Sequence, residues 1–119
     1  MAWSVFYYET AKGDKPIEDF LNALSNEARA KCLAYISRLE IDGTRLPASI
    51  AAHVRGKIWE LRPEWSCNEY RFFYGAIVGR RFVILHAIQK KRQKLRERDI
   101  ATAEQRYEDI RGRIRDEDA

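Results

Sequence analysis

The sequence has few of the residues from which metal sites are built. Among its 119 residues there are two cysteines and two histidines. Cys32 and Cys67 do not have the spacing of a zinc-ligand pair, and His53 and His86 do not complete one. The sequence therefore predicts no metal site and no cofactor, and Cys32, which falls in a helical apolar stripe, is expected in the core.

Long hydrophobic runs are also absent. Charged residues interrupt every apolar stretch well before the roughly 18 residues that a membrane-spanning helix needs. The first residues, MAWSVFYYET, lack the basic and then apolar pattern of a secretory signal, so we expect a cytoplasmic protein with no membrane partner. The length and the 45% hydrophobic share suit a single domain, residues 1–119, with one core.

Positive charge is unevenly distributed along the chain. The net charge is +4, but residues 54–98 contain 12 basic and 4 acidic residues, against 6 and 7 in residues 1–53 and 4 and 7 in residues 99–119. A concentrated positive field favours partners that carry phosphate. A run of charge can also be a solvated face and no more. Here the charges alternate with aromatic residues on predicted strands, which favours a binding surface.

A strand and a helical hairpin are predicted for the first part of the chain. Aromatic and β-branched residues predict a strand over residues 3–8. Pro16 suits the first turn of a short helix, and Ser25 is the predicted cap of a second helix, which Gly43 ends. Residues 44–56 have no clear period, so we predict a connecting loop with room for a turn of helix.

Three consecutive strands are predicted next, with the sequences KIWELRP, EYRFFYGAIV and RRFVILHAI. A basic tail, QKKRQK, follows them. The apolar stripe within residues 100–114 predicts a final helix that packs on its own sheet or on a partner. Together these elements predict an α+β fold in which an N-terminal strand and a helical hairpin pack on an antiparallel sheet, with a C-terminal helix.

Alternation along the predicted strands separates charged from apolar side chains. Successive residues of a strand point to opposite faces. If the helices cover the face that carries Leu61 and Phe72, three charged side chains project from the opposite, less protected face. These are Glu60, Arg62 and Arg71. The sequence thus predicts that arginines of neighbouring strands converge where a polyanion can reach them.

Such a cluster suits the cleavage of a phosphodiester in RNA. Arginine is well suited to the clamp because its planar donors meet two phosphate oxygens at once. The ribose 2′-hydroxyl can act as the nucleophile, so the protein must supply a base, a clamp and an acid. We assign Glu60 as the base, Arg71 and Arg62 as the clamp, and Lys90 or His86 as the acid. This scheme requires no metal.

Each assignment has a structural alternative. His86 is in phase with apolar neighbours and could be a hydrogen-bonded, half-buried histidine. Glu60 could simply pair with Arg62 or Arg71. Trp65, in the loop between two strands, could stack on a base or cover the core. Four further basic residues are interpreted as contacts to the RNA backbone: Lys57, Lys91, Arg92 and Lys94.

The order of elements and four motifs resemble the RelE/ParE toxin superfamily, and within it the HigB-like, phage-derived branch. The motifs are WELR, EYRFFY, VILHAIQKKRQK and DIATAEQR, and the resemblance covers nearly the whole chain. It implies a type II toxin, a ribosome-dependent mRNA endoribonuclease that inhibits translation. A cognate antitoxin, commonly a helix-turn-helix DNA-binding protein, would neutralise it.

The resemblance also assigns residues. It carries the family's strand arginines to Arg71 and Arg62, and the basic pair after the last strand to Lys90 and Lys91. The sequence departs from the RelE pattern in having Glu60 at a strand position of lysine, and in lacking an evident catalytic tyrosine in the final helix.

Two other functions are compatible with the same fold. A ParE-like protein would inhibit DNA gyrase by binding it, and a degenerate toxin would only bind its antitoxin. The basic strand face and the KKRQK tail favour RNA, because gyrase inhibition needs no convergent phosphate site.

Overall fold

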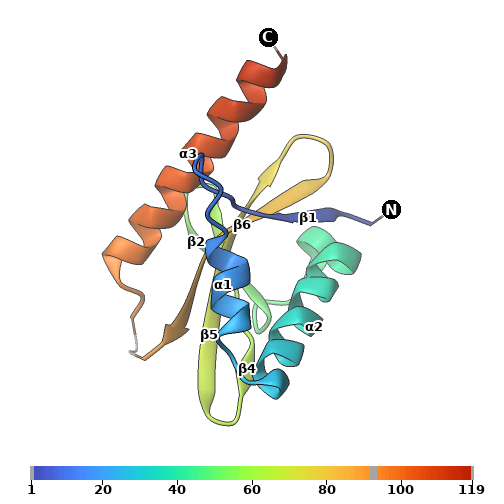
Figure 1. Cartoon of the computed structure of the whole chain (residues 1–119). Helices are drawn as coiled ribbons and strands as arrows, with labels where there is room; N and C mark the ends of the chain where they lie inside the picture. The colour runs from blue at the N-terminus through green and yellow to red at the C-terminus, as the bar shows by residue number, and fades with distance from the viewer. Residues whose placement is uncertain (1, 92–93, 119) are drawn as a thin grey trace.

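A mixed β-sheet lies at the centre of the fold (Figure 1). The computed structural model describes residues 2–91 and 94–118. Six strands of this part of the chain form the sheet in the order β1-β6-β5-β3-β2, with β4 paired to β5. Their bounds are β1 Ser4–Tyr7, β2 Ala51–Arg55, β3 Ile58–Leu61, β4 Glu64–Trp65, β5 Asn68–Ile77 and β6 Arg81–Lys90.

All strand pairs are antiparallel except one, because β1 adds in parallel to β6 at one edge. β6 is therefore a central strand, as its apolar character on both faces predicts. β5 and β6 form the longest hairpin, and Gly79 takes a φ of +85° in its turn. Glycine adopts that conformation without steric cost, which permits the tight turn between the two strands.

Helices cover both faces of the sheet (Figure 1). The helical bounds are α1 Pro16–Asn22, α2 Asn26–Asp42, the 3₁₀ helix η1 Gly43–Arg45, and α3 Glu97–Asp118. The side chain of Ser25 accepts a hydrogen bond from the backbone N–H of Ala28, and Gly43 ends α2, as predicted. Over the stretches 2–91 and 94–118, no helix has the length and apolar character that crossing a membrane requires.

The predicted alternation of β3 and β5 is confirmed. Leu61, Phe72 and Tyr74 are buried against α1 and α2, while Ile58 and Phe73 are buried on the other face against α3. α3 packs by the predicted stripe, in which Ala103 and Tyr107 are buried, and it packs on its own sheet. The face with the charged residues is therefore covered along part of its length.

The prediction of a loop over residues 44–56 was wrong in its second half. η1 is the turn of helix for which the loop had room, but Ala51–Arg55 is a strand, β2, at the edge of the sheet. β2 pairs only with β3, and its register shifts between His53 and Arg55. An irregular edge strand that begins with two alanines lacks the strict alternation by which strands are recognised.

The α+β class and the RelE-like order of elements are thus as predicted. The additions to the predicted sheet are two short strands, β2 and β4, and the parallel pairing of β1. Arg55 of β2 also reaches α3, where it lies 2.6 Å from both Glu97 and Glu104. This contact ties the sheet edge to the helix that covers the charged face.

Candidate functional site

Glu60 of β3 lies between two guanidinium groups. Its Oε2 is 3.6 Å from Nε of Arg71, and its Oε1 is 3.7 Å from Nε of Arg62. The pairing of Leu61 with Phe72 sets this geometry, because it places the end of β3 and the start of β5 side by side. The predicted convergence of Arg62 and Arg71 is therefore present, and it is centred on a carboxylate.

Arg71 is buried, with 1% of its surface exposed. The prediction that it projects from a less protected face was wrong. Ile88 pairs with it across β6, and its guanidinium donates to the backbone oxygen of Tyr70 at 2.9 Å and to Oε1 of Glu69 at 3.0 Å. Both terminal nitrogens of the Arg71 guanidinium therefore donate to the protein itself, and the side chain is shielded from solvent.

The buried pair is not fully hydrogen-bonded. Nε of Arg71 and Oε2 of Glu60 have no hydrogen-bond partner among the described residues, since the 3.6 Å between them exceeds a normal hydrogen bond. Buried polar atoms are nearly always satisfied, and exceptions concentrate at sites with a functional use. Glu60 and Arg71 therefore form a buried ion pair without a direct hydrogen bond between the two groups.

Burial raises the pKa of the Glu60 carboxyl above its ordinary value of 4.5, and Arg71, Arg62 and Lys90 partly oppose this by favouring the charged form. The exposed fraction of the residue is 8%. A raised pKa means that this carboxyl holds a proton more readily than an exposed one, which suits a group that accepts a proton in general acid–base chemistry.

Arg62 opens onto a groove at the end of the sheet where β5 begins and β6 ends, at the bottom of Figure 1. The hollow has a volume of about 830 Å³, and Lys90 and Lys91 line it with Arg62. A smaller adjoining hollow of about 230 Å³ shares these two lysines and continues the positive lining. We call the combined surface the basic groove; its cations are Arg62, Lys90, Lys91, Lys94, Arg96 and Arg98.

His86 lies away from Glu60. The strand pairing sets Glu60, Phe73 and His86 in one row across three strands, so the Phe73 ring lies between the two titratable groups. Nε2 of His86 is 2.8 Å from Oδ1 of Asp99, and its ring stacks on Phe73. The structure does not bring His86 to the Glu60 carboxylate. The contacts of His86 fit the alternative of a hydrogen-bonded, half-buried histidine.

The other predicted RNA contacts fall in different places. Lys91 and Lys94 line the basic groove, and Trp65 is exposed beside it on β4. Lys57 lies in the turn between β2 and β3, at the opposite end of the sheet. Arg92 lies outside the described residues.

Two residues of the site were missed by sequence reasoning. Glu69 binds Arg71, and the signal for it was available, because residues two apart on a strand share a face. Asp99 binds His86 from α3, and no local pattern could reveal that pairing because it joins two elements through the fold.

Residues 19–108 match the model of the family described as Phage derived protein Gp49-like (DUF891). This match spans well over half of the chain. The chain belongs to this family. Membership indicates a toxin of a toxin–antitoxin system, of the RelE-like kind, and with it an antitoxin partner.

The matched range of this Gp49-like protein includes Glu60, Arg62, Arg71 and Lys90, so the carboxylate and its cations lie within the family's domain. Among curated proteins there is no significant match to the chain.

Proposed function

We propose that this Gp49-like protein is a toxin that cleaves mRNA on the ribosome and so inhibits translation. The observation that carries the proposal is the Glu60 carboxylate, held between Arg62 and Arg71 beside the basic groove. A groove lined by lysine and arginine attracts the phosphates of a single strand. A titratable carboxyl beside it supplies the proton transfer that cleavage needs.

The chemistry can be written with the ribose of the RNA as its nucleophile. The Glu60 carboxylate accepts the proton of the 2′-hydroxyl, whose oxygen attacks the neighbouring phosphorus to form a 2′,3′-cyclic phosphate. The bond from phosphorus to the 5′-oxygen of the next nucleotide breaks, and Lys90 donates a proton to that oxygen. Arg62 and Lys91 bind the non-bridging oxygens, whose negative charge increases in the transition state.

Arg71 takes a different part from the one that the sequence predicted. Because its guanidinium is buried and bonded to Tyr70 and Glu69, it acts on Glu60 and not on the phosphate. We assign it as a positioning residue that fixes the carboxylate and limits the rise of its pKa. Arg62, with about a third of its side chain exposed, remains as the arginine that reaches the RNA.

The ribosome is part of the proposal because the sequence resembles RelE, and this resemblance implies a ribosome-dependent nuclease. A purified-component assay tests it: the same mRNA is offered free and in translating ribosomes. We expect cleavage only, or much faster, in the ribosomal sample. Equal rates would make the protein a ribosome-independent ribonuclease and would remove this part of the proposal.

The experiment for the whole proposal is induced expression in cells followed by primer extension on a reporter mRNA. Wild-type protein should stop growth and break the message within its coding region. Glu60→Gln should lower cleavage by about 100-fold or more, the usual share of a general base. Lys57→Ala, a lysine change at the far end of the sheet, should cleave like the wild type. Intact message with a DNA-damage response would instead support gyrase inhibition.

A further inference from the structure

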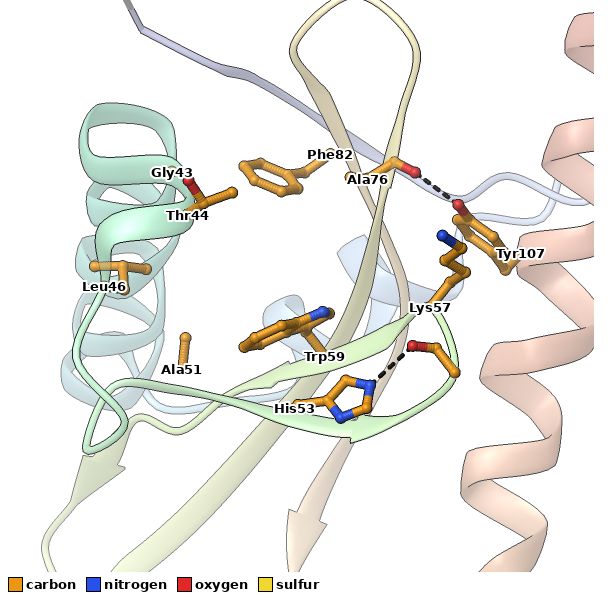
Figure 2. Close-up of a pocket in the computed structure, with 11 residues that line it drawn as sticks. Gly43, Thr44, Leu46, Ala51, His53, Lys57, Trp59, Ala76, Phe82 and Tyr107 are labelled. Carbon is orange, nitrogen blue, oxygen red and sulfur yellow. Dashed lines mark hydrogen bonds between the residues drawn. The ribbon is translucent and has the colours of Figure 1, made fainter.

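A second hollow lies at the end of the sheet opposite to the basic groove. Its volume is about 600 Å³, and its walls come from η1, from the β2–β3 hairpin, from β5 and β6, and from α3. Figure 2 shows Ala51 and Leu46 on one side of the Trp59 ring and Tyr107 on the other, with Phe82 above the ring. We call this surface the apolar groove.

The apolar groove is preformed and open to solvent. Trp59 is 42% exposed, although it is a large aromatic residue on a strand in the middle of the fold. The walls beside it are fixed by hydrogen bonds drawn in Figure 2: His53 Nε2 lies 2.8 Å from the Gly56 oxygen, and the Tyr107 hydroxyl donates to the Ala76 oxygen at 2.7 Å. An exposed tryptophan in a fixed setting is the usual anchor of a protein interface.

The apolar surface continues past Tyr107. A hollow of about 360 Å³ shares Lys57, Ala76 and Tyr107 with the apolar groove and adds Ile77, Val78 and Ile114. Val78, at the tip of the β5–β6 hairpin, is 74% exposed. The two hollows therefore form one elongated apolar strip, which suits an extended or helical segment better than a small molecule.

The charged residues that line this strip are all basic. Lys57, Arg111 and Arg115 line it, and neither hollow has an aspartate or glutamate in its lining. Arg111 has Glu108 at 3.4 Å, whereas Lys57 and Arg115 have no acidic partner in the described part of the chain. Cations without partners beside exposed apolar side chains are complementary to a ligand with both acidic and apolar groups.

We propose that the apolar groove and its extension dock an acidic amphipathic helix of a partner protein. The apolar stripe of that helix packs on Trp59, Val78 and Ile114, and its acidic flank faces Lys57 and Arg115. A nucleic acid fits the surface less well, because its phosphates would meet the cations but leave the aliphatic side chains without contact. The proposal does not depend on the RNA cleavage proposed above, since the two sites share no residue.

The test is a fluorescence anisotropy titration with two synthetic helices of about 18 residues, or five turns. Both carry leucine at the i, i+3, i+4, i+7 positions; one has glutamate at the flanking positions and the other has lysine there. We expect the acidic helix to bind at least about tenfold more tightly to the wild-type protein. In the double variant Lys57→Glu/Arg115→Glu this preference should reverse.

A matched pair of tryptophans locates the site. Trp59→Ala should weaken binding of the acidic helix by at least about tenfold, as expected for an aromatic anchor. Trp65→Ala is the control, because Trp65 is equally exposed, at 42%, but lies by the basic groove. Arg62→Ala should also leave helix binding unchanged.

Several results would overturn this inference. They are equal binding of the two helices, no binding of the acidic helix, a charge-reversed variant with unchanged preference, or Trp59→Ala with wild-type affinity. Displacement of the acidic helix by single-stranded RNA would show that the surface binds nucleic acid instead. None of these outcomes bears on mRNA cleavage, which is tested separately with substitutions in the site of Glu60 and Arg62.

Discussion

The two ends of the sheet differ in what surrounds their basic residues. At the end where β6 stops, Arg62 and Lys90 stand near a buried carboxylate and open onto a groove with more lysine and arginine. At the end where β5 turns into β6, Lys57 and Arg115 border exposed apolar side chains. Positive charge alone therefore does not define a nucleic-acid site; its neighbours decide which partner it fits.

The same contrast exists on a smaller scale around Glu60. Arg71 and Arg62 approach the carboxylate at almost equal distances, but Arg71 is buried and Arg62 is partly exposed. A buried ion pair is costly to break because one charge is left without a partner, whereas an exposed pair contributes little. Replacing Arg71 should therefore mainly lower the stability of the protein, whereas replacing Arg62 should mainly weaken RNA binding.

The largest expected effect follows from replacing Arg71. Arg71→Met should lower the free energy of unfolding by about 3 kcal/mol, because it removes the buried partner of Glu60 and leaves this carboxylate with the partly exposed Arg62 alone. Arg62→Met, its matched control, should lower it by less than about 1 kcal/mol. Urea denaturation measures both values. If the double variant Glu60→Gln/Arg71→Met were less stable than Arg71→Met, the assumed coupling between the two residues would be wrong.

The second-largest effect is expected on RNA affinity, which should distinguish the two ends of the sheet. Arg62→Ala/Lys90→Ala should weaken the binding of a single-stranded RNA of about 20 nucleotides by about tenfold to 100-fold at low salt. The slope of log affinity against log salt should fall by about 1 for each phosphate that the variant no longer binds. Lys57→Ala/Arg115→Ala removes as much charge from the other end and should change neither quantity. Equal weakening in both double variants would mean that net charge alone governs binding.

A glycine between the helix and the sheet permits a third test. A Cβ at Gly75 would lie 2.6 Å from the Tyr107 ring, so Gly75→Ala should lower the free energy of unfolding by about 2 kcal/mol. Gly112, on α3, has open space around it, and Gly112→Ala should raise stability by about 0.5 kcal/mol. Because Tyr107 lines the apolar groove, Gly75→Ala should weaken helix binding but not RNA binding. Similar thermal melting of the two variants would contradict the packing described.

The pH dependence of stability gives the smallest effect. Burial raises the pKa of Glu60 in the folded protein above the ordinary value of 4.5, so the folded state binds this proton more tightly than the unfolded chain. The resulting stability is complete below pH 4.5 and is lost as the pH rises through the folded-state pKa. Wild-type protein should therefore lose stability relative to Glu60→Gln as the pH rises above 4.5, as measured by urea denaturation. If the free energies of unfolding of the two proteins differed by the same amount at every pH, the pKa of Glu60 would not be raised in the folded protein.

The strands and their faces could be predicted because alternation is a local property. Glu60, Arg62 and Arg71 were placed on one face by counting residues, and the register of β3 and β5 brings them together. The burial of Arg71 could not be predicted in this way, because it depends on side chains from other strands and on where α3 packs. For the same reason the contact of His86 with Asp99 was not visible in the sequence.

The apolar groove illustrates a second limit. Alternation places Trp59 on the same face as Leu61, which the helices cover, but Trp59 lies beyond their reach and is partly exposed. Part of its wall is β2, the strand whose irregular pattern was interpreted as a loop. Exposure at the edge of a covered face depends on helix length and placement, which a residue pattern does not encode.

The most direct test of the central claim, that RNA occupies the basic groove, is the alkylation rate of Cys67. This thiol is exposed and lines the groove beside Arg62, whereas Cys32 is buried and burial raises its pKa to about 11, so a thiol reagent reports on Cys67. Saturating single-stranded RNA should slow alkylation several-fold, and the acidic helix should leave it unchanged. An unchanged rate with bound RNA would place the RNA elsewhere on the protein and contradict that claim.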